Sequence, residues 1–412
     1  MRSVFKALAF TVGLQSAWSA EPEFVPWDCH VIDDSSLGAD GVKLADVNGD
    51  GLKDITTGWE EGGITRVYLN PGPAKAKEKW PAVTVGKTPS VEDAVFVDLD
   101  GDGAIDVVSS CEGKEMAMHV HWAPKKEDLL KPEAWKQEVI PASKQAKQQW
   151  MYAMPVQVDG KHGTDLIAGS KNKGAQVGWF EVPADARDLE AWKWHPITPA
   201  GWIMSIWPMD MDGDGDMDVV VSDRRGKLRG CHWLENPGAG EAQKQMWKRH
   251  PMGAHDKEVM SMCLADLDRD GLQDALVAVK DMKVLWLRRL DKGGTQWETH
   301  VIDADHGAGN TRAVQAAYLT PNNHNSLLIT TWIAENKHGV FWLEGDGTPL
   351  DGGWKPRQIS GIEKGSKFDR IELLDIDQDG GVDLLTCEEN EGPGSRGMGV
   401  IWYRNPIGKA QP

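Results

Sequence analysis

A nine-residue acidic pattern recurs along the chain and constrains the fold more than any other feature. The pattern is Asp-x-Asp/Asn-x-Asp-Gly-x-x-Asp followed by an apolar run. Two degraded copies, at 157–165 and 319–326, complete a series of seven with steps of 52 to 59 residues. Seven units of this period predict a propeller or a solenoid instead of separate globular domains. The five intact copies are 46–54, 98–106, 210–218, 266–274 and 375–383.

The residues around each copy favour the propeller. After the acidic loop comes a short apolar strand, then a strand that often ends in Trp-x-x-Asn-Pro, as at 233–237 and 402–406. A third signal, Trp followed five residues later by an apolar side chain, marks another strand in six units. Four short strands per unit, separated by turn residues, are typical of a propeller blade.

The two ends of the repeat region predict a closed ring. Residues 27–32 form a fourth strand with no blade before it, and the last unit, 368–406, has three strands and no fourth. Pairing the two completes a seventh blade and leaves no free sheet edge. We therefore expect an all-β fold: a seven-bladed propeller over 21–407 with four antiparallel strands per blade, closed by the N-terminal strand, and a C-terminal tail over 408–412.

The N-terminus has the composition of a secretory signal over 1–20. Arg2 and Lys6 precede an apolar stretch over 7–14, and small residues follow at 17–20. The apolar stretch is too short to span a bilayer, and we expect no membrane span elsewhere. The mature protein is therefore expected to be secreted or periplasmic. Five cysteines fit no zinc or redox spacing; we expect mostly buried thiols and leave any disulfide pairing open.

The composition also excludes some partners. The formal net charge is −18, with the acid excess gathered in the acidic loops. A strongly acidic chain is a poor partner for nucleic acid or an anionic membrane surface.

The acidic loops are candidate calcium sites. Oxygen ligands at positions 1, 3, 5 and 9 of a glycine-containing loop suit a hard cation, close to the EF-hand spacing but without its position-12 glutamate. Unbound, the clustered carboxylates would repel one another. We expect up to five structural Ca²⁺ ions, with an asparagine-rich or aspartate-rich turn without metal as the alternative. The predicted ligands are Asp46, Asn48, Asp50, Asp54, Asp98, Asp100, Asp102, Asp106, Asp210, Asp212, Asp214, Asp218, Asp266, Asp268, Asp270, Asp274, Asp375, Asp377, Asp379 and Asp383.

With these motifs the chain resembles the FG-GAP / VCBS repeat family, which includes the integrin α propeller. The strands that end in Trp-x-x-Asn-Pro are similar to those of secreted bacterial VCBS-repeat proteins and, more distantly, of the propeller portion of aldos-2-ulose dehydratase. The further domains of that enzyme have no counterpart among these repeats, so its chemistry is not carried over. The resemblance implies that the calcium loops are structural and lie on the face opposite the usual ligand face.

Counting six residues beyond each loop's last position gives equivalent places on that opposite rim. Acids fall on blades seven, one and two, bases on blades three to five, and tryptophan on blade six. The start of strand one adds Asp369, Asp40, Glu92 and Asp93 on the acidic side, and Trp150, Tyr152 and Trp202 on blades three and four. The six-residue count gives Glu60, Glu112, Lys171, Arg224, Lys280, Trp332 and Glu389.

This segregation predicts a polarised pocket at the mouth of the ring. The acids would hold a cation or polyol hydroxyls, the bases a carboxylate or other anion, and the aromatics a sugar face. A further functional divalent cation is thus one expectation. The alternative is an ordinary solvated rim.

Three functions follow as hypotheses. The first is a binding module for carbohydrate or another extracellular ligand, with Trp150 and Trp202 as stacking candidates. The second is a lyase or dehydratase that performs β-elimination on uronic or keto sugars. In it Tyr152, His255 and His306 would carry protons, and Arg224 and Arg312 would bind the anion. The third is a protein-interaction scaffold with a broad, flat face.

Overall fold

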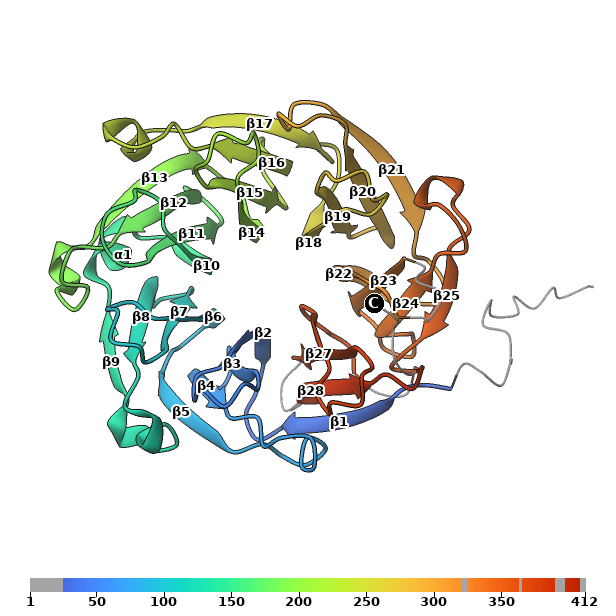
Figure 1. Ribbon diagram of the computed structural model, residues 1–412, viewed down its shortest axis with the longest axis horizontal. Helices are drawn as coiled ribbons and strands as arrows, with labels where there is room; N and C mark the ends of the chain where they lie inside the picture. The colour runs from blue at the N-terminus through green and yellow to red at the C-terminus, as the bar shows by residue number, and fades with distance from the viewer. Residues whose placement is uncertain (1–24, 320–324, 363–364, 390–396, 408–412) are drawn as a thin grey trace, which may run out of the picture.

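The computed structural model describes residues 25–319, 325–362, 365–389 and 397–407, which form a ring of seven four-stranded antiparallel sheets (Figure 1). The expected fold is confirmed. The predicted signal at 1–20 and the tail at 408–412 lie outside the described residues. Among the described residues no helix has the length and apolar character needed to cross a membrane.

Each of blades one to six takes four consecutive strands, numbered outward from the axis. The strands of blades one to three are β2 (Ala39–Ala45), β3 (Asp54–Trp59), β4 (Ile64–Tyr68), β5 (Ala82–Lys87); β6 (Val91–Val97), β7 (Asp106–Cys111), β8 (Ala117–Trp122), β9 (Lys136–Val139); and β10 (Gln149–Val156), β11 (Asp165–Lys171), β12 (Gln176–Glu181), β13 (Lys193–Pro199). Those of blades four to six are β14 (Ile203–Met209), β15 (Asp218–Asp223), β16 (Gly230–Glu235), β17 (Lys248–Gly253); β18 (Val259–Ala265), β19 (Asp274–Val279), β20 (Lys283–Arg289), β21 (Trp297–Asp303); and β22 (Asn310–Ala317), β23 (Ser326–Trp332), β24 (Val340–Glu344), β25 (Lys355–Gln358).

Blade seven closes the ring as the sequence predicts. Its strands are β26 (Glu372–Leu374), β27 (Asp383–Glu388), β28 (Gly399–Arg404) and, outermost, the N-terminal β1 (Asp28–Asp33). β1 pairs antiparallel with β28, with His30 opposite Trp402. Both ends of the described chain therefore meet in one sheet (Figure 1).

Helical segments are short and lie in connections. They are α1 (Pro141–Ala146) and the 3₁₀ segments η1 (Lys126–Asp128), η2 (Pro132–Ala134), η3 (Leu189–Ala191), η4 (Glu241–Lys244) and η5 (Pro349–Asp351).

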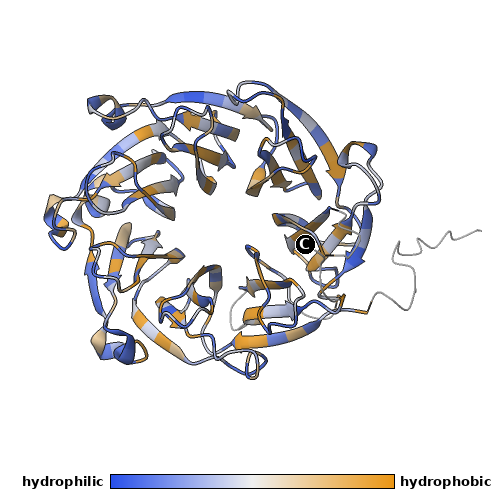
Figure 2. Cartoon of the chain, in the orientation of Figure 1, coloured by the Kyte–Doolittle hydropathy of each residue, from blue (hydrophilic) through white to orange (hydrophobic). Residues whose placement is uncertain are grey.

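The core lies between neighbouring blades. Strand two is buried on both faces: every residue of β3, β7, β15, β19 and β27 is buried. Outermost strands such as β25 are partly exposed, and Figure 2 shows long hydrophilic stretches along the outer strands. Six tryptophans on the third strands are buried in this core: Trp122, Trp179, Trp233, Trp286, Trp342 and Trp402. The five cysteines, all within the described residues, form no disulfide, and four of them are buried.

Candidate functional site

A polar cavity of about 260 Å³ opens at the mouth of the ring. Its walls come from the starts of the innermost strands and the ends of the second strands, opposite the acidic loops. The six-residue count correctly brings Glu60, Lys171, Arg224 and Trp332 to this wall. The full lining is Asp40, Glu60, Glu92, Met151, Lys171, Trp202, Arg224, Met260, Arg312, Trp332 and Lys367.

Backbone bulges aim several of these side chains at the cavity. In the innermost strand of each of blades one to six, the pairing with strand two shifts register near the mouth. A bulge inserts an extra residue and turns its side chain out of the regular alternation. The residues skipped in this way include four that line the cavity: Glu92, Met151, Met260 and Arg312.

Asp40 lies at the centre of the acidic side. It belongs to two carboxylate groups whose oxygens lie within 4.8 Å of one another, one with Glu60 and Glu92, the other with Asp369 and Glu389. Burial, followed by the charges of Glu389 and Asp369, raises the pKa of Asp40 well above its usual value. This shift favours a proton on Asp40, from which Asp369 accepts a hydrogen bond.

Two cations hold the other carboxylates of this side. Arg312 forms two hydrogen bonds of 3.2 Å to Asp369. Lys367 pairs with Glu389. Burial nevertheless raises the pKa of Glu389 to about 8, and its Oε1 is buried without a hydrogen-bond partner. Among the described residues, no basic side chain lies within 4.0 Å of Asp40 or Glu60, so this wall keeps an excess of acid.

Lys171 joins the acidic side to the basic side. Its Nζ lies 2.8 Å from Glu92 and 2.5 Å from Glu112. Burial raises the pKa of Glu92 to about 7 despite this pair. Glu112, predicted as a wall residue, thus reaches the site through Lys171.

The basic side is a cluster of cations around Glu258, which sequence reasoning missed. Arg224, Arg225 and Lys280 lie 2.7, 3.3 and 3.4 Å from its carboxylate oxygens. Within the described part of the chain, no other acid lies within 4.0 Å of these three cations. Three positive charges share one negative charge, so the cluster keeps an excess of positive charge.

Trp202 and Trp332 position these cations. The charged groups of Lys171, Arg224 and Arg225 lie 4.8, 4.9 and 4.7 Å from the Trp202 ring. The Trp332 ring has Arg224 at 5.7 Å and Lys280 at 5.5 Å. These are cation–π contacts. The expectation that Trp202 offers its face to a sugar needs correcting, because cations of the chain already cover that ring.

Two further predicted site residues lie below the cavity wall. Trp150 is fully buried, against Phe180 and Trp194, because it immediately precedes the bulge that turns Met151 inward; it cannot contact a ligand. Tyr152 is also buried, with the Arg370 guanidinium 3.7 Å from its ring. Burial raises the pKa of the Tyr152 phenol, so it stays protonated at neutral pH.

The predicted proton-carrying histidines do not join Tyr152. His255 and His306 lie in the connections from strand four to the next strand one, and neither lines the cavity. His255 is exposed and packs on the His232 ring at 5.1 Å. The three residues proposed for β-elimination are therefore not assembled in one place.

On the opposite face, the last aspartate of each acidic loop has a backbone role. Asp218 accepts hydrogen bonds from the amides of Met211 and Asn236, at 2.8 and 2.7 Å. Asp54, Asp106, Asp274 and Asp383 bond in the same way. Asp165 does so too, although its loop has lost most other acids. This position therefore joins the loop to the end of strand three whether or not the loop is a candidate cation site.

The remaining loop acids differ from blade to blade. Arg187 binds Asp100 at 2.5 Å, Arg288 binds Asp268 at 2.5 Å, and Arg404 binds Asp377 at 2.7 Å. Among the described residues, no basic side chain lies within 4.0 Å of the acids of loops 46–54 and 210–218. The glycine at position six has φ of +87° to +99° in all five intact loops, a backbone conformation that favours glycine.

Comparisons with known proteins agree with the fold. Residues 46–109 match the family model of the FG-GAP-like repeat. No curated protein matches the chain in sequence.

Solved structures align over nearly the whole ring. Two structures of BBS1N in complex with ARL6DN, soaked with mercury and with lead, cover 94% and 93% of this chain and 98% and 99% of theirs, with TM-scores of 0.53 and 0.52 and identities of 10% and 9%. YCF48 from Cyanidioschyzon merolae covers 92% of this chain and 98% of its own, with a TM-score of 0.53 and 9% identity. At these identities the likeness shows the fold alone. The fold supports a binding or interaction module in general. The repeat match over residues 46–109 and the seven-bladed ring together support an FG-GAP-like β-propeller.

Proposed function

We propose that the chain is a binding module whose mouth cavity takes a small carbohydrate that carries a carboxylate and several hydroxyl groups, such as a uronic acid. The observation that carries the proposal is the unequal charge of the two walls. Three cations share Glu258 on one side, while Asp40 and Glu60 on the other lie within one carboxylate group.

The chemistry of the walls matches such a ligand. Guanidinium groups bind carboxylates through charge-assisted, often bidentate hydrogen bonds. The indoles of Trp202 and Trp332 restrict the motion of Arg224, which reduces the entropy lost on binding. The carboxylates opposite are hydrogen-bond acceptors for sugar hydroxyls. A neutral sugar would leave the cation cluster without its anion.

Calorimetric titration with glucuronate and galacturonate, and with glucose as the neutral analogue, tests this function. We expect glucose to bind at least about tenfold more weakly, and Arg224→Met to weaken uronate binding by a similar factor. Lys173→Met is the matched control, because Lys173 is exposed in the turn between β11 and β12. Equal affinity for glucose and glucuronate, or unchanged uronate binding by Arg224→Met, would refute the proposal.

We also propose that the acidic loops bind Ca²⁺ as structural ions. Their spacing offers several carboxylate oxygens to one hard cation. This role is in keeping with the export expected from residues 1–20.

A further inference from the structure

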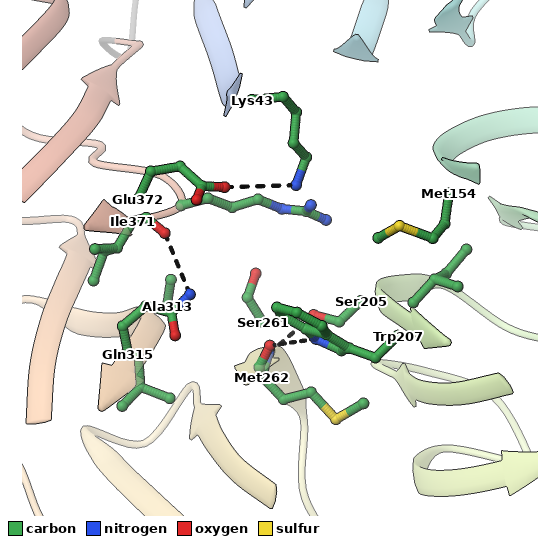
Figure 3. A pocket seen from close by; sticks show the side chains of 13 residues that line it. Lys43, Met154, Ser205, Trp207, Ser261, Met262, Ala313, Gln315, Ile371 and Glu372 are labelled. Atoms are coloured by element: carbon green, nitrogen blue, oxygen red, sulfur yellow. Dashed lines mark hydrogen bonds and ion pairs between the residues drawn. The ribbon is translucent and has the colours of Figure 1, made fainter. Parts of the chain in front are cut away.

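A second chamber lies in the axial channel below the mouth cavity. Its volume is about 240 Å³. Its lining continues along the same innermost strands: Arg312 and Met260 face the mouth, and the next residues, Ala313 and Ser261, line this chamber. Figure 3 shows its side chains around an open centre. None of its lining residues was singled out as a site by the sequence.

Three hydrogen-bond donors of this chamber have no acceptor. The Lys43 Nζ lies 4.0 Å from Glu372, an ion-pair distance that is too long for a hydrogen bond. The Nε of Arg370 and the hydroxyl of Ser261 are buried without a hydrogen-bond partner, and Ser261 is 5% exposed. Figure 3 shows Lys43 and Ser261 directed into the open centre from different strands.

Three other polar side chains of the lining are already hydrogen-bonded within the protein. Ser205 donates to the carbonyl of Met204 and accepts from the amide of Met262. The Trp207 indole donates to the carbonyl of Met262 at 2.9 Å. The Gln315 amide donates to the carbonyl of Ile371. Among the described residues, the Glu372 carboxylate has only its 4.0 Å ion pair with Lys43, so the unsatisfied groups of the lining are three donors and one carboxylate.

Two cations meet in this space. Arg370 is fixed by the Tyr152 ring and by a hydrogen bond of 3.1 Å from its Nη2 to the carbonyl of Met204. Burial and the charge of Arg370 lower the pKa of Lys43. Glu372 and Asp93 are the acids that face these cations. Unpaired buried donors are costly, and an acceptor-rich anion would satisfy them together.

We propose that this chamber binds a small oxyanion, held by Lys43, Arg370 and Ser261. A carboxylate and an inorganic phosphate or sulfate share the required chemistry, which is several oxygens on one compact negative group. The volume suits an ion of this size and not a polymer. The inference does not rest on the carbohydrate proposed for the mouth cavity, whose anion would lie at Arg224.

Calorimetric titration of the full chain with acetate, phosphate and sulfate, against chloride at equal ionic strength, tests the proposal and separates its two sources. We expect saturable binding of at least one oxyanion, weakened at least about tenfold by Lys43→Met and severalfold by Ser261→Ala. Ser261→Ala is the smaller change, so it keeps the test available if Lys43→Met does not fold. Lys173→Met should bind as the unchanged protein does.

Three results would overturn the proposal. In the first, none of the three oxyanions binds saturably up to about 10 mM, which would mean that water alone fills the chamber. Another is binding that neither Lys43→Met nor Ser261→Ala weakens. The third is oxyanion binding lost in Arg224→Met and retained in Lys43→Met, which would place the anion in the mouth. Uronate binding that depends on Arg224 tests the carbohydrate proposal for the mouth cavity and has no bearing on the oxyanion proposal.

Discussion

Arg312 on β22 binds Asp369 of blade seven through two parallel hydrogen bonds, Nε to Oδ1 and Nη2 to Oδ2, both of 3.2 Å. Both side chains are buried, with 8% and 1% exposure. The pair joins neighbouring blades beside the mouth cavity. The charges of Arg312 and Arg370 and the hydrogen bond from Asp40 hold the pKa of Asp369 below its usual value despite its burial.

Arg312→Met should therefore destabilise the ring. It leaves the Asp369 charge buried next to Asp40 and Glu389, and breaking a buried ion pair from one side costs about 3–5 kcal/mol. Urea denaturation at pH 7 measures the loss. Arg312→Met combined with Asp369→Asn should recover part of it, because the double variant has no unpaired charge. A loss below about 1 kcal/mol in the single variant would show that solvent reaches Asp369.

Asp40→Asn should stabilise the protein at high pH. The raised pKa means that the folded state holds this proton more tightly than the unfolded state does. Its contribution is present in acid and is lost as pH rises from the ordinary aspartate range through the folded pKa. Asparagine keeps a donor for Asp369 and carries no charge.

Thermal melts at pH 5 and pH 8 check this prediction, with exposed Asp256→Asn as the control. The gain over the unchanged protein should be larger at pH 8. Destabilisation by Asp40→Asn that appears only with added divalent cation would contradict the prediction. It would instead support the expectation of a functional cation near the mouth.

The acidic loops should differ in calcium affinity. Loop 210–218 has four aspartates at the ligand positions and no basic partner within 4.0 Å among the described residues, whereas Arg288 already binds Asp268 in loop 266–274. A bound cation must displace or repel that arginine. Calcium should raise the melting temperature, by mass action on the native state. Asp214→Asn should remove more of this rise than Asp270→Asn. Identical melting temperatures in calcium and in chelator would exclude structural calcium.

Asp165→Ala should destabilise the protein by the same amount with and without calcium. Asp165 accepts hydrogen bonds from the backbone amides of Val158 and Val182, at 3.0 Å each. Leaving two buried amides unsatisfied costs about 2–6 kcal/mol. Its degraded loop keeps only one other acid of the pattern, Asp159, which pairs with Lys161. Parallel denaturation in calcium and in chelator measures both values. A loss that grows when calcium is added would assign Asp165 to a cation site.

The sequence predicts those parts of the structure that depend on residues close together in the chain. The repeat period, the turn residues and the alternating strands determine the ring and its closure by β1, because each repeats once per blade. The six-residue count places Lys171 and Arg224 because strand two is regular.

The count fails where the backbone is irregular. A bulge has no residue signature here, so Trp150 was expected at the mouth where Met151 points. Glu258 and Arg370 occupy places outside the counted positions, and their role depends on neighbours from other blades. Contacts between side chains of different blades cannot be predicted from the repeat period of a single sequence.

His121 should make stability sensitive to acid. It is fully buried, and its Nε2 lies 2.9 Å from the Ser109 hydroxyl while its Nδ1 lies 3.2 Å from the Val85 carbonyl. A neutral imidazole satisfies both contacts by accepting from Ser109 and donating to Val85. Burial, with the neighbouring His119, lowers the pKa of His121 to about 3. Below about pH 6.5 the unfolded histidine takes up a proton that the folded one refuses, so stability falls with pH from about 6.5 toward 3.

The comparison of His121→Gln with the unchanged protein isolates this group from the carboxylates that titrate in the same range. Glutamine offers one donor and one acceptor but does not titrate. At pH 7.5 we expect His121→Gln to be less stable, by about 1–3 kcal/mol, because its amide cannot match both contacts as well. The deficit should shrink steadily as pH falls to 4.5, since acid destabilises only the histidine form through this site. A deficit that stays constant across the range, measured by urea denaturation at each pH, would mean that His121 takes up its proton as readily in the folded state as in the unfolded state.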